Sequence, residues 1–290
     1  MQELLMQITA GIANGTIYAS LALALVIIFQ STHTINFAQG EMATFSAFLA
    51  WYGMDNGWSY WVAVPFVVVI SFGIGVVVQR VFVRPVENKS HLSVIIVYIG
   101  LMLIFNGLSG WLFGHPLKTF ESPFSPQFFP NSIYFSPHQF GAIVVMLMVM
   151  LMLFLFLRYT KVGLAMRGGA INPKSARLVG INVSWMLAMG WGLAAMIGAV
   201  AGVMVAPSVY LEPNMMAGVL LYAFAGALIG GLDNPWGAVV GGFIVGILEN
   251  VLGAYVIGAD LKLSLALVLI VIVLTLKPEG LFGKKVVARV

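Results

Sequence analysis

Two glutamates lie inside apolar stretches of the sequence, where acidic side chains are rare. Glu41 follows Asn36 and Gln39 near one end of an apolar run, and Glu249 precedes Asn250 in a glycine-rich run. An acidic side chain in a membrane segment is costly, and by default it marks a transport path or a specific contact between helices. These five residues are therefore our candidates for a translocation path.

Each glutamate has more than one interpretation at this stage. Glu41 has three interpretations. It could be part of a polar patch beside the path, it could brace a broken helix there, or it could cap the cytoplasmic end of its span. For Glu249 and Asn250, hydrogen bonding between helices is favoured over contact with a solute, because no cationic partner is evident. A zwitterion held firmly at mid-membrane would need paired opposite charges, and we find no basic residue deep in a predicted span.

The segment 163–180, GLAMRGGAINPKSARLVG, is basic and carries the signals of a short helix. Asn172 is a favourable N-cap, Pro173 suits the first helical position, and Gly180 suits the residue just past the end. The pattern predicts a helix over 173–179. A capped helix between two spans suits docking on a partner, whereas composition alone favours an ordinary basic loop.

Other kinds of chemistry find little support. Lys174 and Ser175 superficially resemble a phosphate-binding loop, but Pro173 stands where that loop needs glycine, and proline has no N–H to donate. The chain has no cysteine, and its four histidines match no metal-ligand spacing. We therefore expect no catalytic residue, no metal and no cofactor in this chain.

The composition requires lipid as the main solvent. Hydrophobic residues make up 61% of the chain and charged residues 8%, against roughly a quarter charged in soluble domains. We predict an all-α polytopic bundle, a single transmembrane domain over 1–290 with about eight or nine segments. The predicted spans are 4–29, 37–52, 61–79, 92–113, 140–157, 183–206, 217–231, 236–256 and 263–276.

The basic residues indicate the topology. Twelve of the fourteen Lys and Arg residues fall within 80–89, 158–177 and 277–289. Even numbers of spans separate these stretches, so all three can face the cytoplasm, as the positive-inside rule requires. The net charge of +4 is thereby explained without a nucleic-acid partner. The N-terminus is then expected outside, and the first span lacks the marks of a cleavable signal.

Loops and short spans refine this topology. The segments 53–60, 114–139 and 207–216 are predicted outside, and 114–139, with five prolines, is interpreted as an ordered loop packed on the bundle rather than a docking site. The spans 37–52 and 217–231 look short and broken. Irregular backbone at membrane depth is tolerated only where it is buried in protein or lines a wet cavity, so the path is expected there.

Four motifs together resemble a known family. They are INFAQGEM (35–42), GLAMRGGAINPKSARLVGINV (163–183), GGLDNPWGAVVGG (230–242) and KPEGLFG (277–283). In this order and spacing they resemble the permease subunits of branched-chain amino-acid ABC importers, most closely the shorter, H-type permease. One departure is Gly168–Gly169, where alanine is more frequent at the first position. Glycine costs a helix roughly 1 kcal/mol there, which leaves the helical extent before Asn172 open.

The resemblance implies a bacterial inner-membrane protein with several partners. They are a second, M-type permease forming a heterodimer, two cytoplasmic ATPase subunits that hold the ATP, an external solute-binding protein and membrane lipid. The loop at about 158–182 would be the coupling element of an alternating-access transporter. The residues to which this role is carried over are Arg167, Asn172, Pro173, Ala176, Arg177 and Gly180.

The solute and the competing classes remain to be distinguished. Leucine, isoleucine and valine are what the resemblance implies by default, although related systems carry urea, short amides or aromatic acids. An ion-coupled secondary transporter or channel would also have broken helices, but the embedded acids lack a proton-relay pattern. A structural or assembly protein of the membrane would show no solute flux.

Overall fold

The computed structural model describes residues 2–87, 89–124 and 134–283. Within these ranges the protein is helical, and Lys118 and Leu211 form the only β-bridge described there. The all-α fold class predicted from the sequence is confirmed. The expected external N-terminus, part of the loop 114–139, and Lys284, Lys285 and Arg289 of the third basic stretch lie outside the described residues.

Eleven α-helices are described, and short π- or 3₁₀-helical turns extend three of them. The α-helices are α1 (Gln2–Thr32), α2 (Gln39–Asp55), α3 (Tyr60–Val78), α4 (His91–Phe113), α5 (Pro137–Tyr159), α6 (Lys161–Ile171), α7 (Pro173–Leu178), α8 (Val183–Val209), α9 (Met215–Gly230), α10 (Pro235–Leu252) and α11 (Lys262–Leu276). The π-helical turns Gln79–Val83 and Gly253–Ile257 follow α3 and α10, and the 3₁₀ turn Ala259–Leu261 precedes α11.

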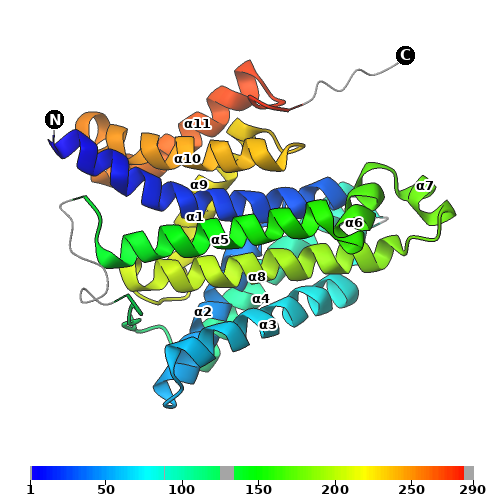
Figure 1. The fold of residues 1–290 in the computed structure, drawn as a ribbon, viewed down its shortest axis with the longest axis horizontal. Helices are drawn as coiled ribbons and strands as arrows, with labels where there is room; N and C mark the ends of the chain where they lie inside the picture. The colour runs from blue at the N-terminus through cyan, green and yellow to red at the C-terminus, as the bar shows by residue number, and fades with distance from the viewer. Residues whose placement is uncertain (1, 88, 125–133, 284–290) are drawn as a thin grey trace. The chain divides into compact units, whose positions relative to one another are not determined.

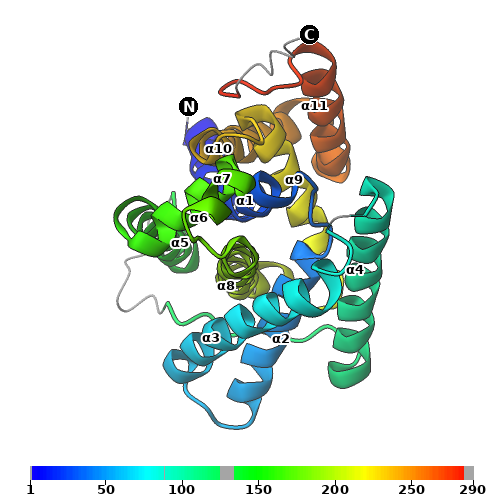
Figure 2. The same cartoon turned by 90° about the vertical axis from the view of Figure 1, so that its right-hand side faces the viewer.

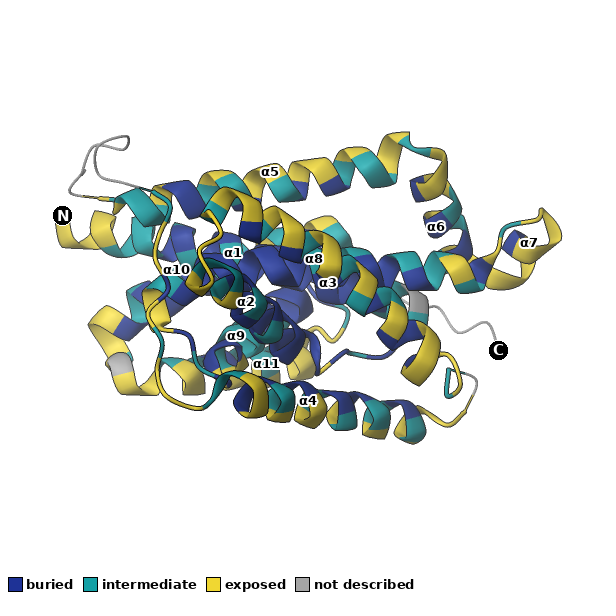
Figure 3. Cartoon of the chain, turned by 90° about the horizontal axis from the view of Figure 1, so that it is seen from below, coloured by how far each residue is buried: buried dark blue, intermediate teal, exposed yellow. Residues whose placement is uncertain are grey.

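Six described helices are long and apolar enough to cross a membrane, and α9 and α11 are shorter apolar helices. These eight described apolar helices agree with the predicted number of about eight or nine membrane segments. Only 28% of the most apolar window of α3, α4 and α5 is buried, against 72% for α8. The exposed faces of these apolar helices, yellow in Figure 3, therefore suit contact with lipid.

Two compact units make up the chain, one from 1–26, 124–144 and 218–290 and the other from 27–123 and 145–217. In the second unit, α8 packs against α2 and α3 (Figures 1 and 2). Glycines make these contacts close: a Cβ on Gly198 would lie 2.7 Å from the Gln39 Nε2 atom, and one on Gly202 would lie 2.6 Å from the Ala43 carbonyl oxygen. Glycine thereby fixes α2 against α8.

In the first unit, α1 packs against α10 through glycines of both helices. A Cβ on Gly11 would lie 2.7 Å from the Ile247 Cα atom, and one on Gly15 would lie 3.0 Å from the Phe243 Cα atom. Gly246 packs in turn against the backbone of Gly15. Small residues thereby allow the backbones of α1 and α10 to approach closely.

Both segments expected to be broken are short or irregular. Between α1 and α2 the backbone leaves the helix at 33–38, yet Thr34, Asn36 and Ala38 are buried. Helix α9 has 16 residues and ends before Gly231, whose φ is +107°. The irregular segment before α2 is thus partly shielded by protein, with His33 and Phe37 exposed.

Candidate functional site

The short helix α7 is capped at both ends. The Ser175 N–H donates to Asn172 Oδ1 at 3.0 Å, and Pro173 occupies the first turn. At the other end Gly180 has a φ of +84°, its N–H donates to the Arg177 carbonyl, and the Ile181 N–H donates to the Ala176 carbonyl. These bonds form a Schellman C-cap. The helix predicted at 173–179 is confirmed as Pro173–Leu178.

The helices on either side of α7 are also capped, which the sequence reasoning missed. Thr160 Oγ1 accepts the Gly163 N–H at 3.0 Å to begin α6, and Asn182 Oδ1 accepts the Trp185 N–H at 3.1 Å to begin α8. Helix α6 continues through Gly168 to Ile171, so the helix does extend before Asn172. Threonine and asparagine just ahead of apolar runs were the available signals.

One side of α7 is buried and the rest is exposed. Ala176 is 5% exposed, whereas Leu178, Val179 and Ile171 are 88%, 76% and 86% exposed. Figure 3 shows this helix as a largely exposed projection. We name Ile171, Leu178 and Val179 the apolar tip. Exposed apolar side chains beside basic residues on a short capped helix suit contact with another protein.

Charged residues connect the first two basic stretches at one end of this unit. Arg80 lies over the Trp185 ring, with its Cζ atom 4.5 Å from the ring centroid. Burial raises the pKa of Glu87, and the charges of Arg84 and Arg177 partly offset that rise. These contacts agree with the predicted topology, in which both stretches face the same side.

The predicted coupling residues divide into positioning and exposed groups. Asn172, Pro173, Ala176 and Gly180 set the shape and seat of α7 through the bonds and burial described above. Arg167 donates through Nη2 to the Arg158 carbonyl near the end of α5, at 3.4 Å, a favourable position for a cation. Arg177 is exposed on α7.

Asn36 and Gln39 hold the start of α2 in place. The Ala38 N–H donates to Asn36 Oδ1 at 3.1 Å, and Asn36 Nδ2 donates to Gln39 Oε1 at 3.4 Å. Gln39 Nε2 donates to the Ala194 carbonyl of α8 at 2.8 Å. Both side chains are fully buried. They therefore satisfy polar groups at a helix break, which is one of the roles considered for this patch.

Glu41 lies in the first turn of α2 and is 6% exposed. Its Oε2 atom accepts a hydrogen bond from Asn106 Nδ2 of α4 at 3.2 Å. Ala38 occupies the N-cap position without a side-chain cap bond, and Glu41 is buried two residues into α2, so the interpretation of Glu41 as an interfacial cap stays a prediction. Asn106, a single amide in an apolar helix, was missed from the sequence.

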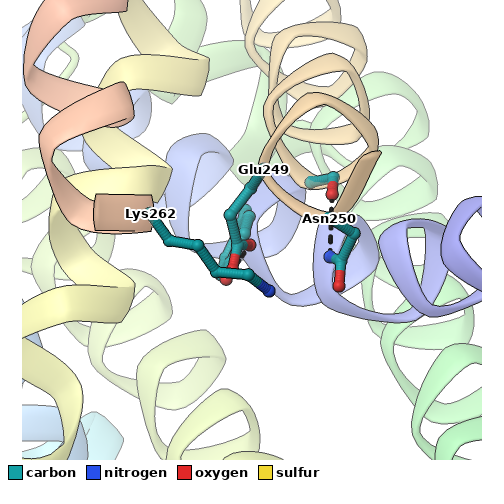
Figure 4. Close-up of polar contacts among 5 residues, drawn as sticks. Glu249, Asn250 and Lys262 are labelled. Carbon is teal, nitrogen blue, oxygen red and sulfur yellow. Dashed lines mark hydrogen bonds and ion pairs between the residues drawn. The ribbon is translucent and has the colours of Figure 1, made fainter. Parts of the chain in front are cut away.

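Glu249 has a cationic partner, contrary to expectation. The Lys262 Nζ atom at the start of α11 lies 3.6 Å from Glu249 Oε1, and the Tyr18 hydroxyl donates to Glu249 Oε2 at 2.8 Å. Figure 4 shows the side chains of Glu249 and Lys262 extending toward each other. The expected bond between helices is confirmed for Glu249. Asn250 instead donates to the Gly246 carbonyl of its own helix at 3.0 Å.

Gly253 explains how Lys262 reaches Glu249. It follows Glu249 by one helical turn, and a Cβ there would lie 2.6 Å from Cε and 2.9 Å from Cγ of Lys262. The apolar stem of the lysine therefore crosses the helix where no side chain obstructs it. Lys262 lies just outside the span predicted at 263–276, which is why no basic residue was expected within reach of this acid.

Helix lengths and exposed apolar surface define a multi-pass membrane protein, and comparison with known proteins identifies its family. The family model for "Branched-chain amino acid transport system / permease component" matches residues 7–276, so the chain belongs to this family. The high-affinity branched-chain amino acid permease LivH of Escherichia coli K12 is 30% identical over 304 residues, with 99% of this chain and 97% of that protein covered. The corresponding permease BraD of Pseudomonas aeruginosa is 27% identical, with 99% and 98% covered.

Proposed function

We propose that this chain is the permease subunit of an ABC importer that moves branched-chain amino acids, or a related small polar solute, inward. Family membership and the names of LivH and BraD support the class of solute. The observation that carries the coupling role is α7, a basic helix capped at both ends, with its apolar tip exposed. Such a helix suits insertion into a cytoplasmic partner.

Membership of the permease family supports the proposed partners. Two ATPase subunits bind and hydrolyse ATP below the permease, a second, M-type permease completes the path, and an external binding protein delivers the solute. ATP binding closes the ATPases and displaces α7. Because Ala176 is buried against the unit and both ends of α7 are capped, the displacement passes to α6 and α8 rather than being lost in a flexible loop.

Charge reversal on α7 tests the coupling role. We expect Arg177→Glu to abolish uptake by the assembled importer without lowering its abundance in the membrane, because an acidic group replaces a base at the proposed contact. The matched control is Lys89→Glu, the same change on an exposed residue of another basic stretch. Uptake and stimulated ATP hydrolysis are measured in proteoliposomes. Transport by Arg177→Glu at the wild-type rate would contradict the coupling role of α7.

Reconstitution of the chain alone tests the competing class. We expect no uptake driven by an ion gradient in proteoliposomes that contain only this permease. Accumulation under those conditions would instead identify an ion-coupled secondary transporter. The orientation is checked by labelling a cysteine placed at position 174, which the proposal requires to be unreactive from outside intact cells.

A further inference from the structure

The Glu41 carboxylate is buried without a cation. It is 6% exposed, and among the residues that the structure describes it forms no ion pair. Its single described hydrogen bond comes from the neutral Asn106 amide. An ionised carboxylate removed from water is costly unless it is paired, so this site is incomplete as it stands. Its place in the first turn of α2, at the positive end of the helix dipole, compensates only part of that cost.

Three oxygen atoms, one of them from Glu41, share one amide nitrogen as their described donor. Asn106 Nδ2 lies 3.2 Å from Glu41 Oε2, 3.3 Å from the Pro213 carbonyl oxygen and 2.8 Å from Asn214 Oδ1. An amide NH₂ has two hydrogens, so three oxygens compete for two donors. The second carboxylate oxygen adds a further acceptor. A group that supplies several N–H donors and a positive charge would satisfy this set of oxygens.

The same residues connect the buried acid with the exterior of the isolated chain. Asn214 is exposed, Asn106 is half-buried and Glu41 is buried. Asn214 belongs to the segment before α9, which the topology places outside. The acceptors therefore extend from an exposed segment to the broken end of α2, one of the two places where a path is expected.

We propose that Glu41, Asn214 and the Pro213 carbonyl form a transient site for the ammonium group of the transported amino acid. This inference rests on the proposed function and adds the part of the solute that is recognised. A primary ammonium group carries three N–H donors and one positive charge, which match the surplus of oxygens. A divalent metal fits less well, because one carboxylate provides too few anionic ligands, and the described residues hold no metal-binding cluster.

The first turn of α2 keeps this carboxylate in position. Gln39 is bonded to the Ala194 carbonyl, and Gly198 and Gly202 allow α2 to lie directly against α8. The carboxylate is therefore preorganised, and binding of a cationic group does not require α2 to move. Selection of the amino acid by an external binding protein is compatible with such a weak site.

Glu41→Gln tests the site in the complete importer, because it keeps the shape and removes the charge. We expect the maximal rate of leucine uptake in proteoliposomes to fall about tenfold or more, since a charge-assisted bond is lost. The solute concentration for half-maximal uptake should stay unchanged, because the binding protein sets it. Glu41→Asp should recover part of the rate, and Glu121→Gln, at an exposed acid of the external loop, should transport like the wild type.

A thiol probe covers the case in which Glu41→Gln alters assembly. The chain has no cysteine, so Glu41→Cys provides a single reactive position in this subunit. We expect labelling by methanethiosulfonate ethylammonium, and protection by leucine with its binding protein. Absence of labelling in every nucleotide state, or full uptake by Glu41→Gln, would overturn the inference. If the wild-type importer did not take up leucine at all, the proposed function itself would be contradicted.

Discussion

The two buried glutamates of the membrane segments differ in their partners. Glu249 lies 3.6 Å from Lys262 and accepts a hydrogen bond from the buried Tyr18 hydroxyl. Glu41 has one neutral amide donor and no cation among the described residues. Each acid is at least 94% buried, with exposures of 5% and 6%. Burial alone therefore does not distinguish a structural acid from one that can receive a ligand.

The difference lies in whether the protein itself supplies the counter-charge. An acid whose charge is already neutralised stabilises the contact between α10 and α11, and a solute would have to displace Lys262 to bind it. An acid with surplus acceptors around it has unused capacity for a cationic group. We therefore assign Glu249 to the architecture and Glu41 to the solute.

Removal of the lysine should give the largest effect on stability. We expect Lys262→Met to destabilise the folded protein by about 2 kcal/mol, because it leaves the Glu249 carboxylate buried and unpaired. The figure is reduced for the partial exposure of Lys262, whose side chain is 28% exposed. Thermal unfolding of the detergent-purified importer measures the loss. The double variant Lys262→Met/Glu249→Gln should recover most of it, and an unaltered midpoint for Lys262→Met would contradict the assignment.

Neutralising Glu41 should increase the stability of the folded protein, in contrast to removal of Lys262. Glu41→Gln is expected to raise the stability by about 1 kcal/mol, because a buried charge without a counter-ion is removed while a hydrogen bond from Asn106 is kept. The same unfolding assay applies, with Glu249→Gln as the counterpart. If both amide variants were destabilised equally, the two acids would have equivalent roles and the distinction would fail.

A methyl group at Gly253 should have the smallest effect. Gly253→Ala is expected to cost about 0.5 kcal/mol, because the added Cβ would crowd the Lys262 stem, whose Cε atom lies 2.6 Å from the ideal Cβ position. The flexible stem can shift, and alanine improves the helix propensity in partial compensation. Leucine uptake should remain at the wild-type level. A large loss of transport would place this cluster in the path instead of the architecture.

The helix signals of the coupling loop were readable because they act locally. Asn172, Pro173 and Gly180 interact with backbone groups within a few positions, so their residue types suffice to predict α7. The exposed apolar tip was missed because exposure depends on what α6 and α8 leave uncovered. Asn106 was overlooked for a similar reason, because the role of a lone amide in an apolar helix depends on its neighbours on other helices.

The sequence by itself predicted a membrane bundle of about eight or nine segments, the short spans near 37–52 and 217–231, and the capped basic helix. Hydrophobic length, proline and glycine positions and capping residues act over one or two helical turns, so these features need no tertiary information. Only the tertiary structure decided which buried acid has a cation. That choice depends on the close packing of helices at glycines such as Gly202 and Gly253, which brings side chains distant in sequence within bonding distance or leaves them apart.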